Sequence, residues 1–220
     1  WMTEKDAHSF QNDIKDDRKK KADMTEWEKA QQGYLYDASY DQEIVDARTK
    51  CADLCYAFNA CRPSDVKTQE KLIREMFGEI RGSFTITAPF YCDYGSNISI
   101  GDNFYTNHNC IILDGAKVTF GDSVFIAPNC VFSTAGHALD ARMRAEGMEI
   151  ALPITVGNRV WIGANVSVLP GVTIGDDTVI GAGSVVNKDI PGGVVAAGNP
   201  CRVIRKITEA DEQKYPIWKE

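Results

Sequence analysis

Apolar residues recur at every sixth position over a large part of the chain. The recurring aliphatic residues are Val156, Ile162, Val168, Ile174, Ile180 and Val186. A second set follows four positions after each of them, at Val160, Val166, Val172, Thr178, Ser184 and Ile190. A period of six fits neither an α-helix nor a simple alternating strand. It predicts short parallel strands that wind into a β-helix, whose stacked coils bury a continuous core.

The repeat is interrupted twice. Glycine follows four of the six aliphatic residues, and we expect it to let the chain turn the corners between strands. The same spacing holds over residues 100–112 and resumes over 120–132 after two extra residues, with Cys110 and Cys130 on the small inward positions. The period is then lost over residues 133–154. A loop of this length inside a repeat array is usually functional or disordered.

A helical section precedes the repeats. Thr25 and Glu28 have the spacing of a capping box, which predicts a short first helix. A second helix is expected over residues 41–61, where apolar residues return at helical spacing. Pro63 breaks the chain, and Ser64 is expected to cap a third helix.

These patterns divide the chain into four parts. Residues 1–23 are expected to form a flexible charged extension, which has no apolar signal-peptide core. Residues 24–80 form a helical cap, 81–207 the β-helix with its loop 133–154, and 208–220 a C-terminal tail. Repeat arrays need caps that cover their terminal coils, so we expect the helices to shield the first coil from water.

Composition narrows the function classes. The chain has 220 residues, of which 44% are hydrophobic and 25% are charged, and its net charge of −7 argues against general nucleic-acid binding. No apolar run reaches the length of a membrane span. The seven cysteines show no metal-ligand spacing and are odd in number. Free thiols in a reducing, cytoplasmic compartment and no metal are the simplest interpretation.

Histidine is the residue type best matched to proton transfer near neutral pH. Of His8, His108 and His137, only His137 lies in the long loop, and loops on rigid scaffolds concentrate catalytic groups. A histidine in a loop can also be incidental. A basic cluster near the end of the repeats suits a phosphate-bearing ligand or a solvated surface equally well.

Six ordered motifs carry a resemblance to a known family. They are Tyr105-Thr106-Asn107-His108-Asn109, Ile126-Ala127-Pro128-Asn129, Gly136-His137, Val160-Trp161-Ile162-Gly163, Pro170 to Gly175, and Gly198 to Ile204. With the helical section, they resemble the maltose/galactoside O-acetyltransferases, which are hexapeptide-repeat acyltransferases. The resemblance implies a mainly β fold, a left-handed parallel β-helix, and a homotrimer with sites between subunits. It also implies acetyl transfer from acetyl-CoA to the hydroxyl of a small sugar.

The resemblance also implies roles for single residues. His137 matches the general base, which takes the proton from the acceptor hydroxyl as its oxygen attacks the thioester directly. Glu149 is a candidate to orient the imidazole or a solvated glutamate, and Asn107 could bond the developing oxyanion or satisfy backbone groups. The acceptor-binding positions are Asp37, Arg48, Asp93, Tyr105 and Asp114. The resemblance also implies a groove that binds the acetyl-CoA donor, formed by Trp161, Ala164, Gly181, Ala182, Lys188, Arg202 and Arg205.

Several alternatives stay open at this point. Asp93 and the pair Asp114-Gly115 favour a maltose- or glucose-type acceptor over a galactoside. A related enzyme could instead acetylate an antibiotic or an amino acid, and a non-catalytic β-helix could serve assembly. A zinc hydrolase on this scaffold needs three histidine ligands, and only two histidines lie outside the charged extension, so we reject it.

Overall fold

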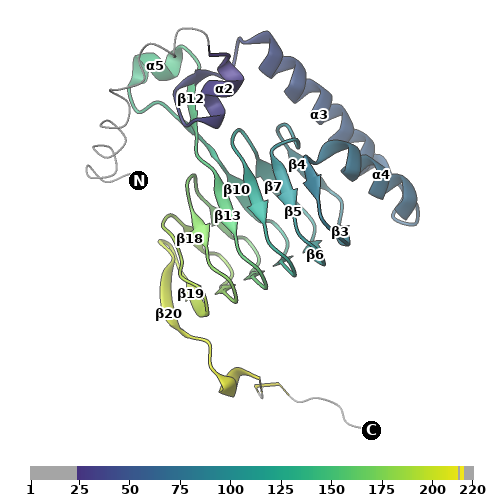
Figure 1. The fold of residues 1–220 in the computed structure, drawn as a ribbon, viewed down its shortest axis with the longest axis vertical. Coiled ribbons are helices and arrows are strands. Elements are labelled where there is room, and N and C mark those ends of the chain that lie inside the picture. Colours follow the sequence, from purple (N-terminus) through teal and green to yellow (C-terminus); the bar gives the residue numbers. More distant parts are fainter. Residues whose placement is uncertain (1–23, 213, 216–220) are drawn as a thin grey trace.

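Short parallel strands stack into a β-helix in the computed structural model, which describes residues 24–212 and 214–215. The predicted extension, residues 1–23, lies outside the described residues. Five successive coils each give one strand to three sheets, and β19 (Val194–Ala197) extends one sheet into a further coil (Figure 1). The predicted parallel β-helix is therefore confirmed.

Each sheet forms one flat face of the coil and is named here by its first strand. The β2 face contains β2 (Glu79–Ile80), β5 (Ile98–Ile100), β8 (Val118–Phe120), β13 (Ile154–Val156) and β16 (Thr173–Ile174). The β3 face contains β3 (Phe84–Ile86), β6 (Phe104–Thr106), β9 (Phe125–Ile126), β14 (Trp161–Ile162), β17 (Val179–Ile180), β19 and the antiparallel β20 (Arg202–Lys206). The β4 face contains β4 (Phe90–Cys92), β7 (Cys110–Leu113), β10 (Val131–Ser133), β15 (Ser167–Val168) and β18 (Val185–Val186).

Every coil therefore turns three corners. The first corner leads from the β2 face to the β3 face, and the second corner leads from the β3 face to the β4 face. The third corner leads from the β4 face to the β2 face of the next coil. These names are used below because the predicted site residues gather at particular corners.

The predicted inward residues form the core. Both sets of six-residue repeats between Val156 and Ile190 are buried, and Cys110 and Cys130 are fully buried on the small inward positions. In the earlier coils larger side chains fill the interior, where the ring of Phe120 lies 5.1 Å from the rings of both Phe104 and Phe132. Burying a large apolar side chain contributes about 1.5–3 kcal/mol, so stacking supplies most of the stability of the coils.

The glycines at the first corner have a different role from the one predicted. A Cβ on Gly157 would lie 2.2 Å from the Oδ1 atom of Asp176, which belongs to the next coil. The left-handed backbone conformation falls two residues later, for example at Arg159 (φ 55°) and Asp177 (φ 56°). The expectation that glycine relieves backbone strain was therefore wrong at Gly157. Glycine is needed because the next coil's side chain occupies the space of its Cβ.

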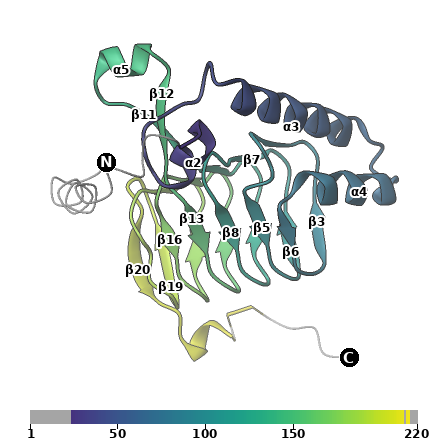
Figure 2. The ribbon, with the colours of Figure 1, turned by 45° about the horizontal axis from the view of Figure 1, so that its top comes forward.

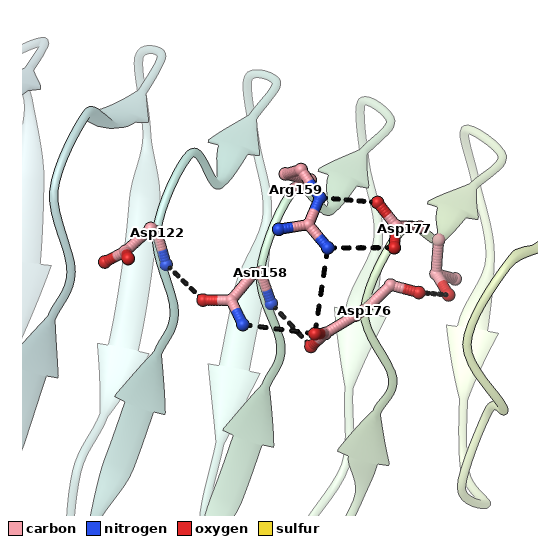
Figure 3. Close-up of polar contacts among 6 residues, drawn as sticks. Asp122, Asn158, Arg159, Asp176 and Asp177 are labelled. Atoms are coloured by element: carbon pink, nitrogen blue, oxygen red, sulfur yellow. Dashed lines mark hydrogen bonds and ion pairs between the residues drawn. The ribbon is translucent and has the colours of Figure 1, made fainter.

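A ladder of side chains joins successive coils at this first corner (Figure 3). Asn158 Oδ1 accepts from the N–H of Asp122 at 2.9 Å, and Asp176 Oδ1 accepts from the N–H of Asn158 at 2.8 Å. Arg159 lies beside them and donates two hydrogen bonds to Asp177, at 2.6 and 2.9 Å. The ladder satisfies backbone donors where the strands end, and so holds neighbouring coils in register.

Among the described residues, three helices precede the coils, as the sequence predicted. They are α2 (Glu26–Gln31), α3 (Gln42–Ala60) and α4 (Val66–Met76), and both bonds of the capping box at Thr25 are present. The cap of α4 differs from the prediction, because the Asp65 carboxylate, and not Ser64, accepts the N–H of Thr68. Buried side chains of α3 and α4, including Phe58 and Ile73, join the core of the coils. The helices therefore cover the first coil.

The segment between residues 133 and 154 is an ordered hairpin. It contains β11 (Ala135–His137), α5 (Ala141–Ala145) and β12 (Met148–Ala151), and it leaves the stack at the third corner (Figure 2). The N-terminal strand β1 (Tyr36–Asp37) pairs with β12, which gives an antiparallel sheet in the order β1-β12-β11. The cap and the hairpin are thus one structural unit.

The C-terminal tail begins with a 3-10 turn at Glu209–Asp211, after β20. Among the described residues, the helices are all too short or too polar to span a bilayer.

Candidate active site

Three of the predicted site residues follow strands of the β4 face in three successive coils. Asp93 comes after β4, Asp114 after β7, and His137 belongs to the hairpin that follows β10. All three therefore lie at the third corner, although 44 positions separate the first from the last. The two extra residues that interrupt the repeat after position 112 belong to the turn that carries Asp114.

His137 faces Glu149 across the hairpin. The two residues are paired in the β11–β12 register, and His137 Nε2 lies 3.9 Å from Glu149 Oε1. The other carboxylate oxygen accepts a hydrogen bond from the Tyr36 hydroxyl at 3.3 Å. The His137 side chain is 59% exposed and that of Glu149 only 19%, so the carboxylate lies behind an accessible imidazole.

The buried side chain of Tyr36 holds the Glu149 carboxylate in place. Its side chain is 2% exposed, and burial, followed by the nearby Glu149 carboxylate, raises the pKa of its hydroxyl. A phenol that stays protonated can donate to Glu149 throughout the neutral range. Tyr36 therefore fixes the carboxylate that faces His137.

A second, smaller core holds the hairpin on the helical cap. It consists of Ala30, Tyr36, Ala38, Ile44, Tyr94, Ala116 and Ala151, with Trp27 and Ala47 packed against it. The rings of Trp27 and Tyr94 meet edge to face at 5.0 Å, and the Gln31 side chain donates to the carbonyl of Gly115 at 3.0 Å. Burial raises the pKa of Tyr94 to about 12. These contacts join α2 to the two turns that contain Tyr94 and Gly115, so they rigidify the third corner.

Asp114 is buried inside this corner. Its Oδ1 atom accepts from the N–H groups of Asp93 at 3.0 Å and Tyr94 at 2.9 Å, and Oδ2 accepts from Asn97 N–H at 3.3 Å. Burial raises the pKa of the Asp114 carboxyl to about 6, although the backbone donors act in the opposite direction. The side chain is 0% exposed. Asp114 thus positions the turn that carries Asp93, and a direct contact with an acceptor stays a prediction.

Asp93 and Arg48 form the charged part of the same corner. Burial raises the pKa of the Asp93 carboxyl, the nearby Arg48 guanidinium partly offsets this, and Glu149 adds to the increase. Arg48 is half-buried and donates to the carbonyl of Ala38 at 3.0 Å. Asp37 stands beside Tyr36 on β1, and its Oδ1 accepts from the N–H groups of Ser39 and Tyr40. The structure thus brings together five predicted residues from the cap, the turns and the hairpin: Arg48, Asp93, Asp114, His137 and Glu149. The Asp37 carboxylate is instead bonded to the turn that follows β1.

The second corner carries a different predicted set. Asn107 follows β6, Ala164 follows β14, and Gly181-Ala182 follows β17, so they recur in stacked coils at one corner. Neighbouring coils approach closely here: Gly183 N–H donates to the carbonyl of Ala164 at 2.8 Å. The small side chains leave the backbone along this corner accessible, with Ala164 half-buried and Ala182 exposed. The donor groove expected at these residues stays a prediction.

The predicted phosphate-binding cations lie at the end of the stack. Lys188, Arg202 and Arg205 are all exposed, and Arg202 lies 3.4 Å from the amide oxygen of Asn187. Arg205 donates to both carboxylate oxygens of Asp211, at 2.8 and 2.7 Å. This pairing raises the pKa of Arg205 and lowers that of Asp211. Arg205 is therefore partly neutralised by its own chain.

Two predicted residues stand on the β3 face instead of at a corner. Tyr105 and Trp161 are paired in register with Phe125, which lies between them. The rings of Tyr105 and Phe125 are 6.3 Å apart, and Phe125 and Trp161 are 43% and 54% exposed. In one chain these residues and the second corner do not meet His137, because the β4 face separates the second corner from the third.

Sequence reasoning missed Tyr36, Tyr94 and Asp211. Tyr36 belongs to a two-residue strand with no readable period. Tyr94 follows the predicted Asp93 in a turn, and no spacing rule singles out an aromatic residue in a turn. Asp211 could have been suspected because it lies six residues after Arg205. The partners of Tyr36 and Tyr94, which are Glu149 and Trp27, lie in distant segments of the chain.

Comparisons with known proteins agree with this architecture. Residues 29–82 match the family model described as the maltose acetyltransferase hexapeptide capping motif, and 153–188 match that of the bacterial transferase hexapeptide repeats. A Saccharomyces cerevisiae protein named as an acetyltransferase is 55% identical over 81% of this chain and 91% of its own length.

Two solved structures are similar over most of the chain. A maltose O-acetyltransferase from Clostridium difficile 630 has a TM-score of 0.82 and 46% identity, covering 84% of this chain and 99% of the other. A galactoside acetyltransferase in complex with coenzyme A has a TM-score of 0.85 and 45% identity, covering 90% and 100%. This chain therefore belongs to the maltose/galactoside O-acetyltransferase family of acetyl-CoA-dependent hexapeptide-repeat acyltransferases.

Proposed function

We propose that this protein transfers the acetyl group of acetyl-CoA to a hydroxyl of a maltose- or glucose-type sugar, with His137 as the general base. The observation that carries the proposal is the pairing of His137 with a mostly buried Glu149 beside Asp93 and Arg48. The names of the similar structures, a maltose O-acetyltransferase and a galactoside acetyltransferase, support the reaction class.

The position of the Glu149 carboxylate determines which nitrogen of His137 is free to accept a proton. Glu149 lies at Nε2 of His137, so it favours the tautomer with the proton on Nε2 and leaves the lone pair on Nδ1. Nδ1 removes the proton of the acceptor hydroxyl as the hydroxyl oxygen bonds to the thioester carbonyl carbon. Glu149 stabilises the imidazolium that results. When the carbon–sulfur bond breaks, the imidazolium returns its proton to the thiolate, and the products are the acetyl ester and free CoA.

The groups around His137 suit a polyhydroxylated acceptor. Carboxylates accept several hydrogen bonds and guanidinium groups donate several, so Asp37, Asp93 and Arg48 can together bind neighbouring sugar hydroxyls. The rigid turn held by Asp114 keeps Asp93 in place. An amide at Asn107 is suited to donate to the oxyanion that forms on the carbonyl oxygen.

We further propose that the active unit is a homotrimer with sites between subunits. His137 is at the third corner and the small-residue groove at the second, on opposite edges of the β4 face. A second chain that brings its second corner to the hairpin would complete the site. Exposed apolar side chains suit such a contact: Leu139 of the hairpin is 85% exposed and Trp161 is 54% exposed. Closed cyclic symmetry would bury identical surfaces on every chain.

The acceptor class is tested by product analysis. Purified protein is incubated with acetyl-CoA and, separately, with glucose, maltose, a galactoside, chloramphenicol and a free amino acid, and the products are measured by mass spectrometry. We expect a mass increase of one acetyl group on glucose or maltose, absent with His137→Ala. Acetylation of chloramphenicol or the amino acid, with no sugar product, would overturn the proposal.

The shared site is tested by complementation. Chains with His137→Ala are mixed with chains carrying Asn107→Ala, and subunits are exchanged by unfolding and refolding. Because each mixed trimer can contain an interface with both wild-type residues, we expect activity to return in the mixture, while each variant alone stays impaired. Mixed trimers as inactive as the separate variants, or an active monomer by light scattering, would contradict a site between subunits.

A further inference from the structure

Three thiols and a thioether meet beneath the helical cap. Cys51 and Cys55 lie one turn apart on α3, Cys92 ends β4, and Met76 ends α4. Cys92 Sγ lies 3.4 Å from Cys51 Sγ and 3.9 Å from Cys55 Sγ. Met76 Sδ lies 3.4 Å from Cys92 Sγ and 3.9 Å from Cys55 Sγ. Cys51 and Cys55 have a C-x3-C spacing, but Cys92 and Met76 come from other elements, so the sequence alone did not indicate a metal site.

The sulfur positions fit a common central ion. Bonds of about 2.3 Å from one metal ion to tetrahedrally arranged sulfur atoms place those atoms about 3.8 Å apart. Four of the sulfur–sulfur separations in the cluster, 3.4 to 3.9 Å, lie close to that value. Within the described part of the chain, these cysteines form a set of three ligating groups within 4.8 Å of one another. Small shifts of side chains would be enough to surround an ion.

The donor atoms select the kind of ion. Thiolate and thioether sulfur are soft ligands, which favour Cu(I), whereas carboxylate and carbonyl oxygen favour Mg²⁺ and Ca²⁺. A disulfide would use only two of the four sulfur atoms and would leave the convergence of Cys55 and Met76 unexplained. All four side chains are at most 9% exposed and belong to the main apolar core. Methionine sulfur is not among the usual ligands of Zn²⁺, so a set of donors that includes Met76 favours Cu(I) over Zn²⁺.

We propose that Cys51, Cys55 and Cys92, with Met76 as a fourth ligand, bind a single cuprous ion between α3 and the first coil. Each thiol that coordinates as a thiolate gives its proton to the bulk buffer, and no electron is transferred. Bound copper would link α3, α4 and β4. It would thereby stabilise the cap that carries Arg48, three residues before Cys51. The copper proposal can fail or succeed independently of the proposed acetyl transfer, because metal occupancy is measured without turnover.

Anaerobic titration tests the site. Fully reduced protein is titrated with Cu(I) supplied as its acetonitrile complex, in competition with a chromophoric Cu(I) chelator. All variants are made in a Cys61→Ser background, because Cys61 is half-buried and could capture copper by itself. We expect one equivalent to bind, and Cys92→Ala to weaken binding by about 100-fold or more through loss of a ligand. The control Cys110→Ala removes an equally buried thiol from the adjacent strand β7 and should leave affinity unchanged.

Two further measurements keep the proposal testable if Cys92→Ala does not fold. Cys55→Ala should weaken binding in the same way. X-ray absorption of the copper-loaded protein should show a shell of sulfur alone, and Met76→Leu, which roughly conserves volume, should remove one sulfur from it. Equal Cu(I) affinity in a folded cluster variant and its parent would overturn the assignment. So would a nitrogen or oxygen shell, or complete displacement of one equivalent of Cu(I) by Zn²⁺.

Discussion

The second and third corners of the same coils are built in opposite ways. At the second corner, Ala164 and Ala182 occupy the same position of successive coils, 18 residues apart, and a backbone hydrogen bond between these coils sets their spacing. Asn107 lies at the same corner of an earlier coil. At the third corner, three successive coils depart from the rhythm, with the turn at Asp93, the enlarged turn at Asp114 and the hairpin of His137.

This difference separates two tasks. A repetitive edge of small residues offers backbone and an even surface, which suit a long extended ligand such as the proposed donor. The irregular edge collects a titratable imidazole, buried carboxylates and a guanidinium from distant segments, which suit acid–base chemistry and the choice of acceptor. The regular corner therefore depends on local sequence, and the irregular one on packing between the cap and the hairpin. Substitutions at the two corners should have different signatures.

The largest expected effect is that of His137→Ala at the third corner. We expect kcat to fall by about two to four orders of magnitude, the usual range for loss of a positioned base, with little change in the KM for acetyl-CoA. Steady-state kinetics with both substrates measure this. The matched control is His108→Ala, an exposed histidine of the second coil, which should retain most of the activity. If the His137→Ala trimer kept more than about a tenth of kcat, the proton would go elsewhere, with Glu149 the next candidate.

Asp114→Ala should have the next largest effect, on stability. It leaves three backbone N–H groups at the third corner without their acceptor, and we expect the free energy of unfolding to fall by about 2–5 kcal/mol. Denaturant unfolding measures this. An unchanged midpoint would mean that the turn at Asp93 does not need the carboxylate.

The same carboxyl predicts a pH dependence. Its pKa is raised to about 6 in the folded protein, so the folded state binds this proton more tightly than the unfolded chain does. Its contribution to stability is fully present below the unfolded pKa of about 4 and is lost as the pH rises through about 6. Stability of the wild type relative to Asp114→Asn should therefore decline over that interval. If the stability of the wild type relative to Asp114→Asn instead increased with pH, this prediction would be contradicted.

Glu149→Gln should reduce kcat by about tenfold or more, because an interaction with a charged group is typically worth about 1.5–3 kcal/mol. Tyr36→Phe removes only the hydroxyl that holds Glu149 and should have a smaller effect in the same direction. Both changes should leave the KM for acetyl-CoA unaltered. If both variants instead raised that KM, the third corner would serve the donor, and the division between corners would fail.

The smallest effect is expected at the cations near the end of the stack. Arg205→Ala should raise the KM for acetyl-CoA several-fold, a modest effect typical of an exposed charge, and should leave the acceptor KM unchanged. Asp211→Asn releases Arg205 from its partner and should lower the same KM. The two variants should therefore change the KM for acetyl-CoA in opposite directions. A KM for acetyl-CoA that stays constant in both would remove Arg205 from the donor groove.

The coils could be predicted because period and burial coincide. Every β-branched or aromatic residue at the sixth positions, such as Phe120 and Val168, is buried in the structure as expected. The helical section could be predicted equally well, except that Asp65 and not Ser64 caps the N-terminus of α4. These predictions succeed because each depends on residues close together in the sequence, where side-chain direction follows directly from the spacing.

The amino-acid sequence by itself determined the β-helix, the helical cap and the family, because repeats and ordered motifs are local signals. Only the tertiary structure decided that Tyr36 holds Glu149 behind His137, that Asp114 is an internal acceptor, and that Arg205 is paired with Asp211. It also decided that thiols from α3 and β4 meet. Each of these contacts joins segments with no common period. Their geometry depends on how the cap and the hairpin pack on the coils, and sequence spacing carries no information about that packing.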